Sequence, residues 1–389
     1  MISKNIGYIR KLDHLRFFAA LLVGIYHFYH FQTAGFTGVE SSIRTKHFFS
    51  AFIVEGHTGV ALFMVLSGFI FAAIGYKRDI VYKDFVVNRI LRIVPLFGVA
   101  IFVAASLSPQ GMQAFVTSFL FPVSGAGGIN YVPITPHLWT IRTEFQFYLL
   151  FPFLIMFVGR YGMRYAFGLL ALMASIRGMI WWSSEAAQLK NITYWSILGR
   201  LDQFLIGMLA GCVYSGRSKL TFPAWLKHWS SATLLFSVPL GCIYFFHRKG
   251  GYWHIREGSS LWIYWPDLEA LAWVIFVVAY VKCEIDWPEK VSRFFGWLGM
   301  LSFSIYVNHW LFVHDFPAYR YLPQFTKSFT TNAVVTFTFV ILPFLAAFSW
   351  LTYQIIERPF IEMRRSYIRK PKEESGTADG AAAPSNQDK

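Results

Sequence analysis

The residues best suited to chemistry lie in the first apolar segment, residues 11–31, which carries Arg16 near its start and His27 in its second half. Their spacing is close to three helical turns, so both side chains are expected on one face, about 16 Å apart along the axis. Ionisable groups in an apolar helix are costly in lipid and are candidate functional residues by default. Because an imidazole can act as a general base or a nucleophile, His27 is the first candidate catalytic residue.

A second basic pair, Arg89 and Arg92, opens a later apolar segment. Residues three apart share a helix face, and the guanidinium fork binds two phosphate oxygens at once. The pair therefore fits a phosphorylated ligand. The structural alternative is that both side chains extend to lipid phosphates at the membrane surface.

Glu144 and Gln146 are polar groups inside the apolar segment 137–152. An unpartnered carboxylate is strongly disfavoured in a low-dielectric environment, so Glu144 needs a partner. Arg142 lies two residues away on a different face, and we expect a histidine or arginine from another helix instead. A purely structural buried ion pair is the alternative.

Hydroxyl and imidazole groups recur at helical spacing late in the chain, at Ser302, Tyr306 and His309, and Ser67 lies in the middle of an early apolar segment. These residues are candidates for a substrate site. The alternatives are a seam of hydrogen bonds between helices and, at Ser67 and Gly68, close helix packing by small residues.

Composition indicates a membrane protein. The 389 residues are 55% hydrophobic and only 14% charged, whereas soluble domains are about a quarter charged. The net charge of +14 is spread over short loops, which is typical of membrane proteins and argues against a nucleic-acid partner. Three scattered cysteines match neither a metal site nor a disulfide framework, so no metal is expected. The first apolar segment lacks a cleavage site and is expected to remain as a helix.

The apolar segments predict an all-α, polytopic membrane protein with about ten transmembrane helices of about 20 residues each. The expected spans are 13–31, 58–76, 88–107, 138–158, 164–182, 197–214, 230–247, 264–282, 297–314 and 331–353. With a cytoplasmic N-terminus, most Lys and Arg residues fall in the inner segments, so both termini are predicted to be cytoplasmic. On this topology the arginines lie at the cytoplasmic side, and His27, Glu144 and His309 lie in the outer half.

Residues 1–360 are predicted to form one membrane domain, followed by a basic and then disordered cytoplasmic tail, 361–389. Glu357, near the end of the last helix, is expected to pair with a basic loop. The uncharged loop 108–137 is rich in Gly and Pro and is expected on the outer side, over a site. His30 lies nearer the outer surface than His27, and we interpret it as interfacial.

Six segments occur in order over residues 12–360: LDHLRFFAALLVGIYH, GVALFMVLSGF, NRILRIVPLF, HLWTIRTEFQFYLLFP, LSFSIYVNH and IIERPF. Together they resemble the integral-membrane acyltransferase-3 family, whose members O-acylate sugars of lipopolysaccharide, exopolysaccharide, peptidoglycan or antibiotics. The resemblance covers the whole expected membrane domain. It implies the stand-alone sugar O-acyltransferase type, without the extracellular domain of longer members.

The resemblance also implies roles for individual residues. The family's arginine–histidine pattern falls on Arg16 and His27, and its Arg-x-x-Arg pattern on Arg89 and Arg92. Its later patterns fall on Trp139, Glu144, Gln146, Phe147, Tyr148, Ser304, Tyr306 and His309. The implied sets are His27, Glu144 and His309 as catalytic residues; Arg16, Arg89 and Arg92 as donor-binding residues; and Trp139, Ser67, Tyr306 and Gln146 as substrate-binding residues.

In this scheme Glu144 orients a histidine or stabilises its charge. Ser67, Tyr306 and Trp139 are the candidate oxyanion donors. The sequence departs from the family pattern at His14, Phe17, Ala61 and Arg142. These departures concern the shape of the pocket and the acceptor rather than the reaction class.

The implied reaction moves an acyl group, usually acetyl, from cytoplasmic acyl-CoA to a sugar hydroxyl of lipopolysaccharide O-antigen or exopolysaccharide at the outer side of a bacterial inner membrane. Acyl-CoA is a substrate, and no permanently bound cofactor is expected. The expected partners are acyl-CoA, a glycan or glycolipid acceptor and membrane lipids. The alternative is a polytopic transporter or flippase of a glycan or lipid intermediate, which the lack of a clear internal repeat disfavours.

Overall fold

The computed structural model describes residues 8–34, 45–107, 136–285, 287–313 and 325–369, most of which are helical. The α-helices are α1 (Arg10–Ala34), α2 (Phe48–Val54), α3 (Gly59–Gly75), α4 (Tyr82–Leu107), α6 (Trp139–Tyr161), α7 (Met163–Trp182), α8 (Leu189–Trp195), α9 (Ile197–Tyr214), α10 (Trp229–Arg248), α11 (Gly251–His254), α12 (Leu261–Lys282), α13 (Glu289–Met300), α14 (Ser302–Val313), α15 (Phe329–Thr336), α16 (Leu342–Thr352) and α17 (Arg358–Glu362). Two π-helical turns, Phe337–Ile341 and Tyr353–Glu357, join the last three into one continuous helix. The described residues contain no strand, and the expected all-α fold is confirmed.

Eight helical stretches in the described residues are long and apolar enough to cross a membrane. They are Gly56–Gly75, Tyr82–Ser106, Trp139–Tyr161, Met163–Trp182, Ile197–Tyr214, Trp229–His254, Leu261–Lys282 and Phe329–Glu362. Each matches one expected span, which confirms the polytopic membrane class. The other two expected spans, 13–31 and 297–314, are also helical but fall outside this set. The later one is divided at Leu301 between α13 and α14, which are 12 residues each.

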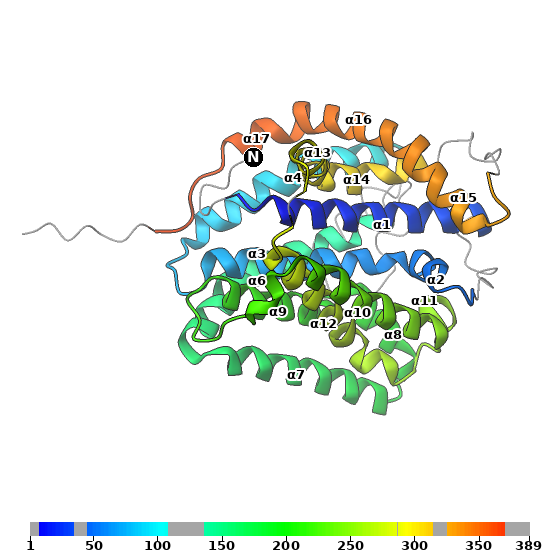
Figure 1. The fold of residues 1–389 in the computed structure, drawn as a ribbon. Helices are drawn as coiled ribbons and strands as arrows, with labels where there is room; N and C mark the ends of the chain where they lie inside the picture. Colours follow the sequence, from blue (N-terminus) through cyan, green and yellow to red (C-terminus); the bar gives the residue numbers. More distant parts are fainter. Residues whose placement is uncertain (1–7, 35–44, 108–135, 286, 314–324, 370–389) are drawn as a thin grey trace, which may run out of the picture.

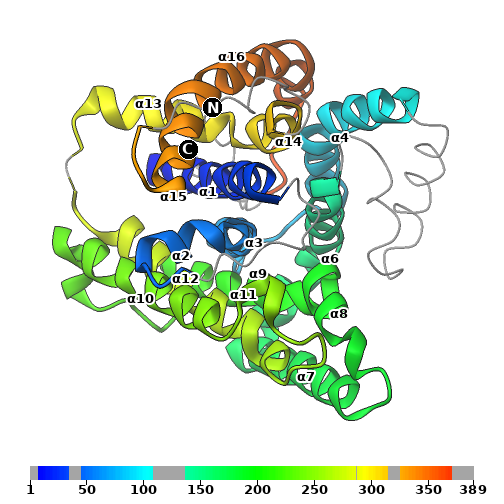
Figure 2. The ribbon, with the colours of Figure 1, turned by 90° about the vertical axis from the view of Figure 1, so that its right-hand side faces the viewer.

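The first helix, α1, runs through the middle of the bundle. Figure 1 shows it beside α3, and Figure 2 shows α13, α14 and α16 on one side of it and α2 and α3 on the other. Its apolar residues are buried on several faces, as Leu15, Ala20 and Ile25 illustrate, because their spacing directs them to different sides of the helix. Since other helices rather than lipid surround α1, it accommodates an arginine and histidines that a lipid-facing helix would exclude.

Small residues bring α3 and α9 into close contact. A side chain at Gly68 would collide with the backbone oxygen of Phe204, and one at Gly207 would collide with the backbone of Val65. Glycine allows two helix backbones to approach closely in a membrane. The packing interpretation therefore holds for Gly68, whereas Ser67 faces a cavity described below.

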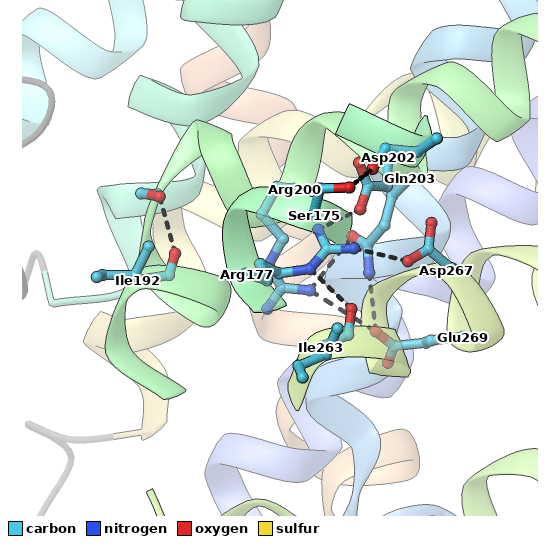
Figure 3. A network of polar contacts seen from close by, with 11 residues as sticks. Ser175, Arg177, Ile192, Arg200, Asp202, Gln203, Ile263, Asp267 and Glu269 are labelled. Atoms are coloured by element: carbon cyan, nitrogen blue, oxygen red, sulfur yellow. Dashed lines mark hydrogen bonds and ion pairs between the residues drawn. The ribbon is translucent and has the colours of Figure 1, made fainter. Parts of the chain in front are cut away.

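A buried charge network joins α7, α9 and α12 (Figure 3). Arg177 donates to Asp202, to Asp267 at 2.7 Å and to the backbone oxygen of Ile263 at 2.8 Å. A second group lies beside it, where Gln203 donates to Glu269 at 2.9 Å and Arg200 lies 3.7 Å from the same carboxylate. The network links α7 and α9 to α12, which follows much later in the sequence.

The chain after α17 returns to the start of α4. Ile368 forms an antiparallel bridge with Ile80, and the Val81 N–H donates to the Tyr367 oxygen at 2.9 Å. The predicted tail, 361–389, therefore begins with a segment, residues 361–369, that packs on the helical bundle. Residues 370–389 and most of the loop 108–137 lie outside the described residues, so their expected disorder and position stay predictions.

Candidate active site

A cavity of about 680 Å³ lies between α1, α3, α4, α6 and α14. One face of α3 lines it from Val60 through Ser67 to Ile74, a distance of about 21 Å along the helix axis. Apolar side chains such as Met64 and Ile70 form much of this wall. The cavity is therefore long and mostly apolar, and its polar groups are concentrated in a few places.

Arginines gather at the end of the cavity beside α17. The lining there includes the three arginines singled out by sequence, Arg16, Arg89 and Arg92, and three more, Arg358, Arg364 and Arg365. The Arg89 guanidinium lies 4.8 Å from the centroid of the Phe71 ring. A cation–π contact of this kind orients a guanidinium without neutralising its charge.

Arg92 has a carboxylate partner. It donates to Glu357 at 2.8 Å, and Ser304 donates to the other oxygen of the same carboxylate. The expectation that Glu357 pairs with a basic loop was wrong, because the π-helical turn before α17 directs this carboxylate into the bundle, toward α4 and α14. Arg16 lies 3.7 Å from Asp13 on its own helix.

Glu144 lies in the middle of the cavity, among hydroxyl groups. Ser67 on α3 donates to Glu144 Oε1 at 2.8 Å, and Tyr148, one turn along α6, donates to the same oxygen. The expected histidine or arginine partner was wrong, because residues four apart on a helix are neighbours and two hydroxyls satisfy this carboxylate. Arg142 instead donates to the backbone oxygen of Trp195 at 3.3 Å.

His27 and His309 lie together beyond the far end of the cavity. The His309 Nδ1–H donates to the backbone oxygen of Tyr306 at 2.6 Å, so the neutral ring has its lone pair on Nε2. That nitrogen is 2.8 Å from His27 Nδ1 and accepts a hydrogen bond from the Nδ1–H of His27. The neutral His27 ring then has its lone pair on Nε2, which is the arrangement that a general base requires.

A third histidine, His137, completes this cluster. Its ring centroid is 4.6 Å from that of His309, and its Nε2–H donates to the Val307 oxygen at 3.1 Å. Its Nδ1 is buried with no hydrogen-bond partner in the described part of the chain. No three His, Cys, Asp or Glu side chains of the described residues are close enough to hold a metal ion.

Tyr306 and Thr140 line the cavity and separate it from the histidines. The Tyr306 hydroxyl donates to the backbone oxygen of His137 at 2.7 Å, and the Thr140 hydroxyl lies 2.7 Å from the Tyr306 oxygen. Since Tyr306 donates to a carbonyl and Ser67 donates to Glu144, neither hydroxyl is directed at an oxyanion in this arrangement.

Three other residues singled out by sequence lie away from the cavity lining. Trp139 packs against Trp195, with ring centroids 4.8 Å apart. The side-chain amide of Gln146 is buried without a hydrogen-bond partner in the described residues. His30 is only 3% exposed and lies 3.0 Å from the Val54 oxygen, so its side chain faces the protein interior, and its depth near the outer surface stays a prediction.

Sequence reasoning missed the arginines that follow the last membrane helix. Arg358, Arg364 and Arg365 were counted only as positive charges of the cytoplasmic side. No motif spacing gave a signal for them: Arg358 reaches the cavity from α17, and the return of the chain to α4 places Arg364 and Arg365 there. Tyr148 was noted only through the family pattern.

The fold and the site define a class, a polytopic membrane protein in which an arginine-lined cavity extends toward a pair of histidines, His27 and His309. The chain belongs to the acyltransferase-3 family: the family model of an acyltransferase domain matches residues 9–354. This places the chain among the acyltransferases, as the sequence motifs implied.

Among its relatives is a protein of Bacillus subtilis named "Putative peptidoglycan O-acetyltransferase YrhL", which is 26% identical over 78% of this chain and 48% of its own length. Another is a Staphylococcus aureus protein named "Putative O-acetyltransferase SACOL0978", which is 24% identical over 94% of this chain and 60% of its own length. The chain thus spans about half to three fifths of these two relatives. A protein of Caenorhabditis elegans, "Regulator of hypoxia-inducible factor 1", is 22% identical over 85% of this chain and 74% of its own length. No solved structure matches.

Proposed function

We propose that this chain transfers an acyl group, usually acetyl, from acyl-CoA to a sugar hydroxyl of a cell-surface glycan. The observation that carries the proposal is the cavity, which connects a group of arginines to Glu144 and reaches Tyr306, whose ring centroid is 5.6 Å from that of His309. Family membership supports the reaction class. The names of the bacterial relatives support acetyl as the group, and the name of the first adds peptidoglycan to O-antigen and exopolysaccharide as possible acceptors.

The donor suits this cavity in charge and shape. Acyl-CoA carries phosphates at one end and a long, narrow acyl-pantetheine arm at the other. The phosphates are proposed to bind Arg89 and Arg92, with Arg16 nearby, and the arm lies along the apolar face of α3. By the positive-inside rule the arginine end is cytoplasmic, where acyl-CoA is available. The protein is accordingly proposed to reside in a bacterial inner membrane.

The chemistry is proposed to take place at the histidine end. His27 Nε2 removes the proton of the acceptor hydroxyl, whose oxygen attacks the thioester carbonyl carbon. The carbon–sulfur bond breaks, and the CoA thiolate receives a proton. The hydrogen bond from His27 Nδ1 to His309 fixes the tautomer and stabilises the imidazolium that forms. An acyl group carried transiently on His27 is the two-step alternative.

The test is acyl transfer by the purified full chain in detergent, measured as CoA thiol release and as a mass gain of one acetyl group on glycan acceptors. The variant His27→Ala should lower kcat by about 10² to 10⁴-fold and bind CoA as the wild type does. The control is His30→Gln, on the same helix, which keeps a donor for the Val54 oxygen. Full activity of His27→Ala, or no acyl-CoA-dependent product from the wild type, would contradict the proposal.

A further inference from the structure

The segment that follows α17 forms part of the cavity wall at its arginine end. The Asn88 side chain donates to the Arg365 backbone oxygen at 2.6 Å and accepts from the Arg365 N–H at 2.9 Å. Tyr367 is 2% exposed, and its ring centroid is 5.2 Å from that of Phe85 on α4. These contacts hold residues 363–369 against α4, so that Arg364 and Arg365 line the cavity.

Arg364 lies among other cations. Burial first, and then the positive charges of Arg92, Arg89 and Arg16, lower the pKa of the Arg364 guanidinium to about 10. The group therefore remains protonated at neutral pH. Like charges gathered at a partly buried place repel one another, and a bound anion would relieve that repulsion.

The order of groups along the donor predicts which anion this is. In acyl-CoA the acyl group, the pantetheine arm, the diphosphate and the 3′-phosphorylated adenosine follow one another. With the acyl group near Tyr306 and the diphosphate at Arg89 and Arg92, the adenosine end lies at the mouth of the cavity. Besides Arg89 and Arg92, the cavity lining at this end includes Arg364, which is partly buried, and Arg365, which is exposed.

We propose that Arg364 and Arg365 bind the phosphomonoester of the donor, the 3′-phosphate of CoA, as a subsite separate from the diphosphate site. The proposal rests on the proposed function, because it requires acyl-CoA in this cavity. A phosphomonoester carries nearly two negative charges at neutral pH and three acceptor oxygens. Two guanidiniums match it in charge and in hydrogen-bond geometry.

The test compares the Kd of CoA with that of 3′-dephospho-CoA, by calorimetry on the full chain in detergent. The wild type should bind 3′-dephospho-CoA about 10- to 100-fold more weakly, as expected for loss of hydrogen bonds to a charged group. Arg364→Gln should weaken CoA binding to the level of 3′-dephospho-CoA and leave the latter unchanged. The side chain of Arg365 is exposed, so Arg365→Gln should fold as the wild type does. This variant should partly reduce the difference in Kd between CoA and 3′-dephospho-CoA.

The matched control is Arg369→Gln, an exposed arginine of the same segment that lies 3.3 Å from Asp79 and should leave both affinities unchanged. Equal wild-type affinities for the two nucleotides would overturn the subsite. Arg364→Gln and Arg365→Gln variants that both keep the wild-type difference would also overturn it and would assign these arginines to lipid phosphates. If the wild type binds neither nucleotide, the proposed donor itself is wrong, so the two failures are distinguishable.

Discussion

Arg177 of the α7–α9–α12 network and Arg89 of the cavity differ in what neutralises their charge. Arg177 is almost fully buried and meets two carboxylates, Asp202 and Asp267 (Figure 3). Arg89 forms no ion pair in the described residues, and its Nε is buried with no hydrogen-bond partner there. Both are arginines in apolar helices, and the sequence around each gives no sign of this difference.

The difference separates structural charges from those that can bind a ligand. A buried cation whose carboxylates are in place has its charge matched and its N–H groups occupied, and breaking such a pair leaves an uncompensated charge. Arg89 is instead positioned by aromatic rings, which orient the guanidinium and leave N–H groups for phosphate oxygens. For Arg177 and Arg89, the partners of the guanidinium therefore indicate its role better than its presence in an apolar helix does.

The largest expected effect is on the stability of the paired network. Arg177→Met should lower the free energy of unfolding by about 3–5 kcal/mol, because it leaves the fully buried Asp202 and the partly buried Asp267 without their cation. The affinity for CoA should change by less than about threefold, since the network does not line the cavity. Thermal unfolding in detergent and calorimetry with CoA measure the two quantities.

The double variant Arg177→Met/Asp202→Leu is the control for that change. Replacing both members of a buried pair by apolar residues often costs little, so part of the stability should return. If Arg177→Met unfolds like the wild type, or loses CoA affinity without losing stability, Arg177 would not be a structural charge distinct from Arg89.

A smaller effect is expected at Arg89, and it should appear in donor binding rather than in stability. Arg89→Gln should raise the KM for acyl-CoA about 10- to 100-fold, which corresponds to the loss of charged hydrogen bonds to phosphate. Its free energy of unfolding should stay close to that of the wild type, because no carboxylate is left unpaired. Steady-state kinetics at several acyl-CoA concentrations separate KM from kcat, and an unchanged KM would show that Arg89 does not bind the donor.

The sequence predicted the helices and the residue types of the site better than their partners. Apolar segment length was enough for eight spans, and the continuous apolar run placed Arg16 and His27 in one helix. Glu144 shows the limit, because its need for a partner followed from electrostatics, whereas the choice of Ser67 depended on how α3 and α6 pack. Such choices are made between helices, where spacing along one segment carries no information.

The π-helical turns and the segment after α17 were unpredictable for the same reason. A basic stretch after the last membrane helix is typical of a solvated tail, and Arg364 was interpreted as part of such a tail. Its position in the cavity depends on contacts of Asn88 and Tyr367 that link residues far apart in the sequence. Roles inferred from motifs are therefore least complete where the chain returns from a distant region.

The smallest expected effect is at Arg358, which lines the cavity like Arg89 but is already paired like Arg177. It donates to Glu362 at 2.8 Å and to Gln354 at 2.9 Å, and it is exposed to solvent. Exposed ion pairs between neighbouring turns of a helix contribute little to stability. If Arg358 keeps these two partners when the donor binds, Arg358→Gln should change the Kd of CoA less than about threefold and leave unfolding unchanged. A loss of affinity as large as that of Arg89→Gln would show that any arginine at the mouth attracts the phosphates through the local field alone, and a strong dependence on ionic strength in both variants would confirm that explanation.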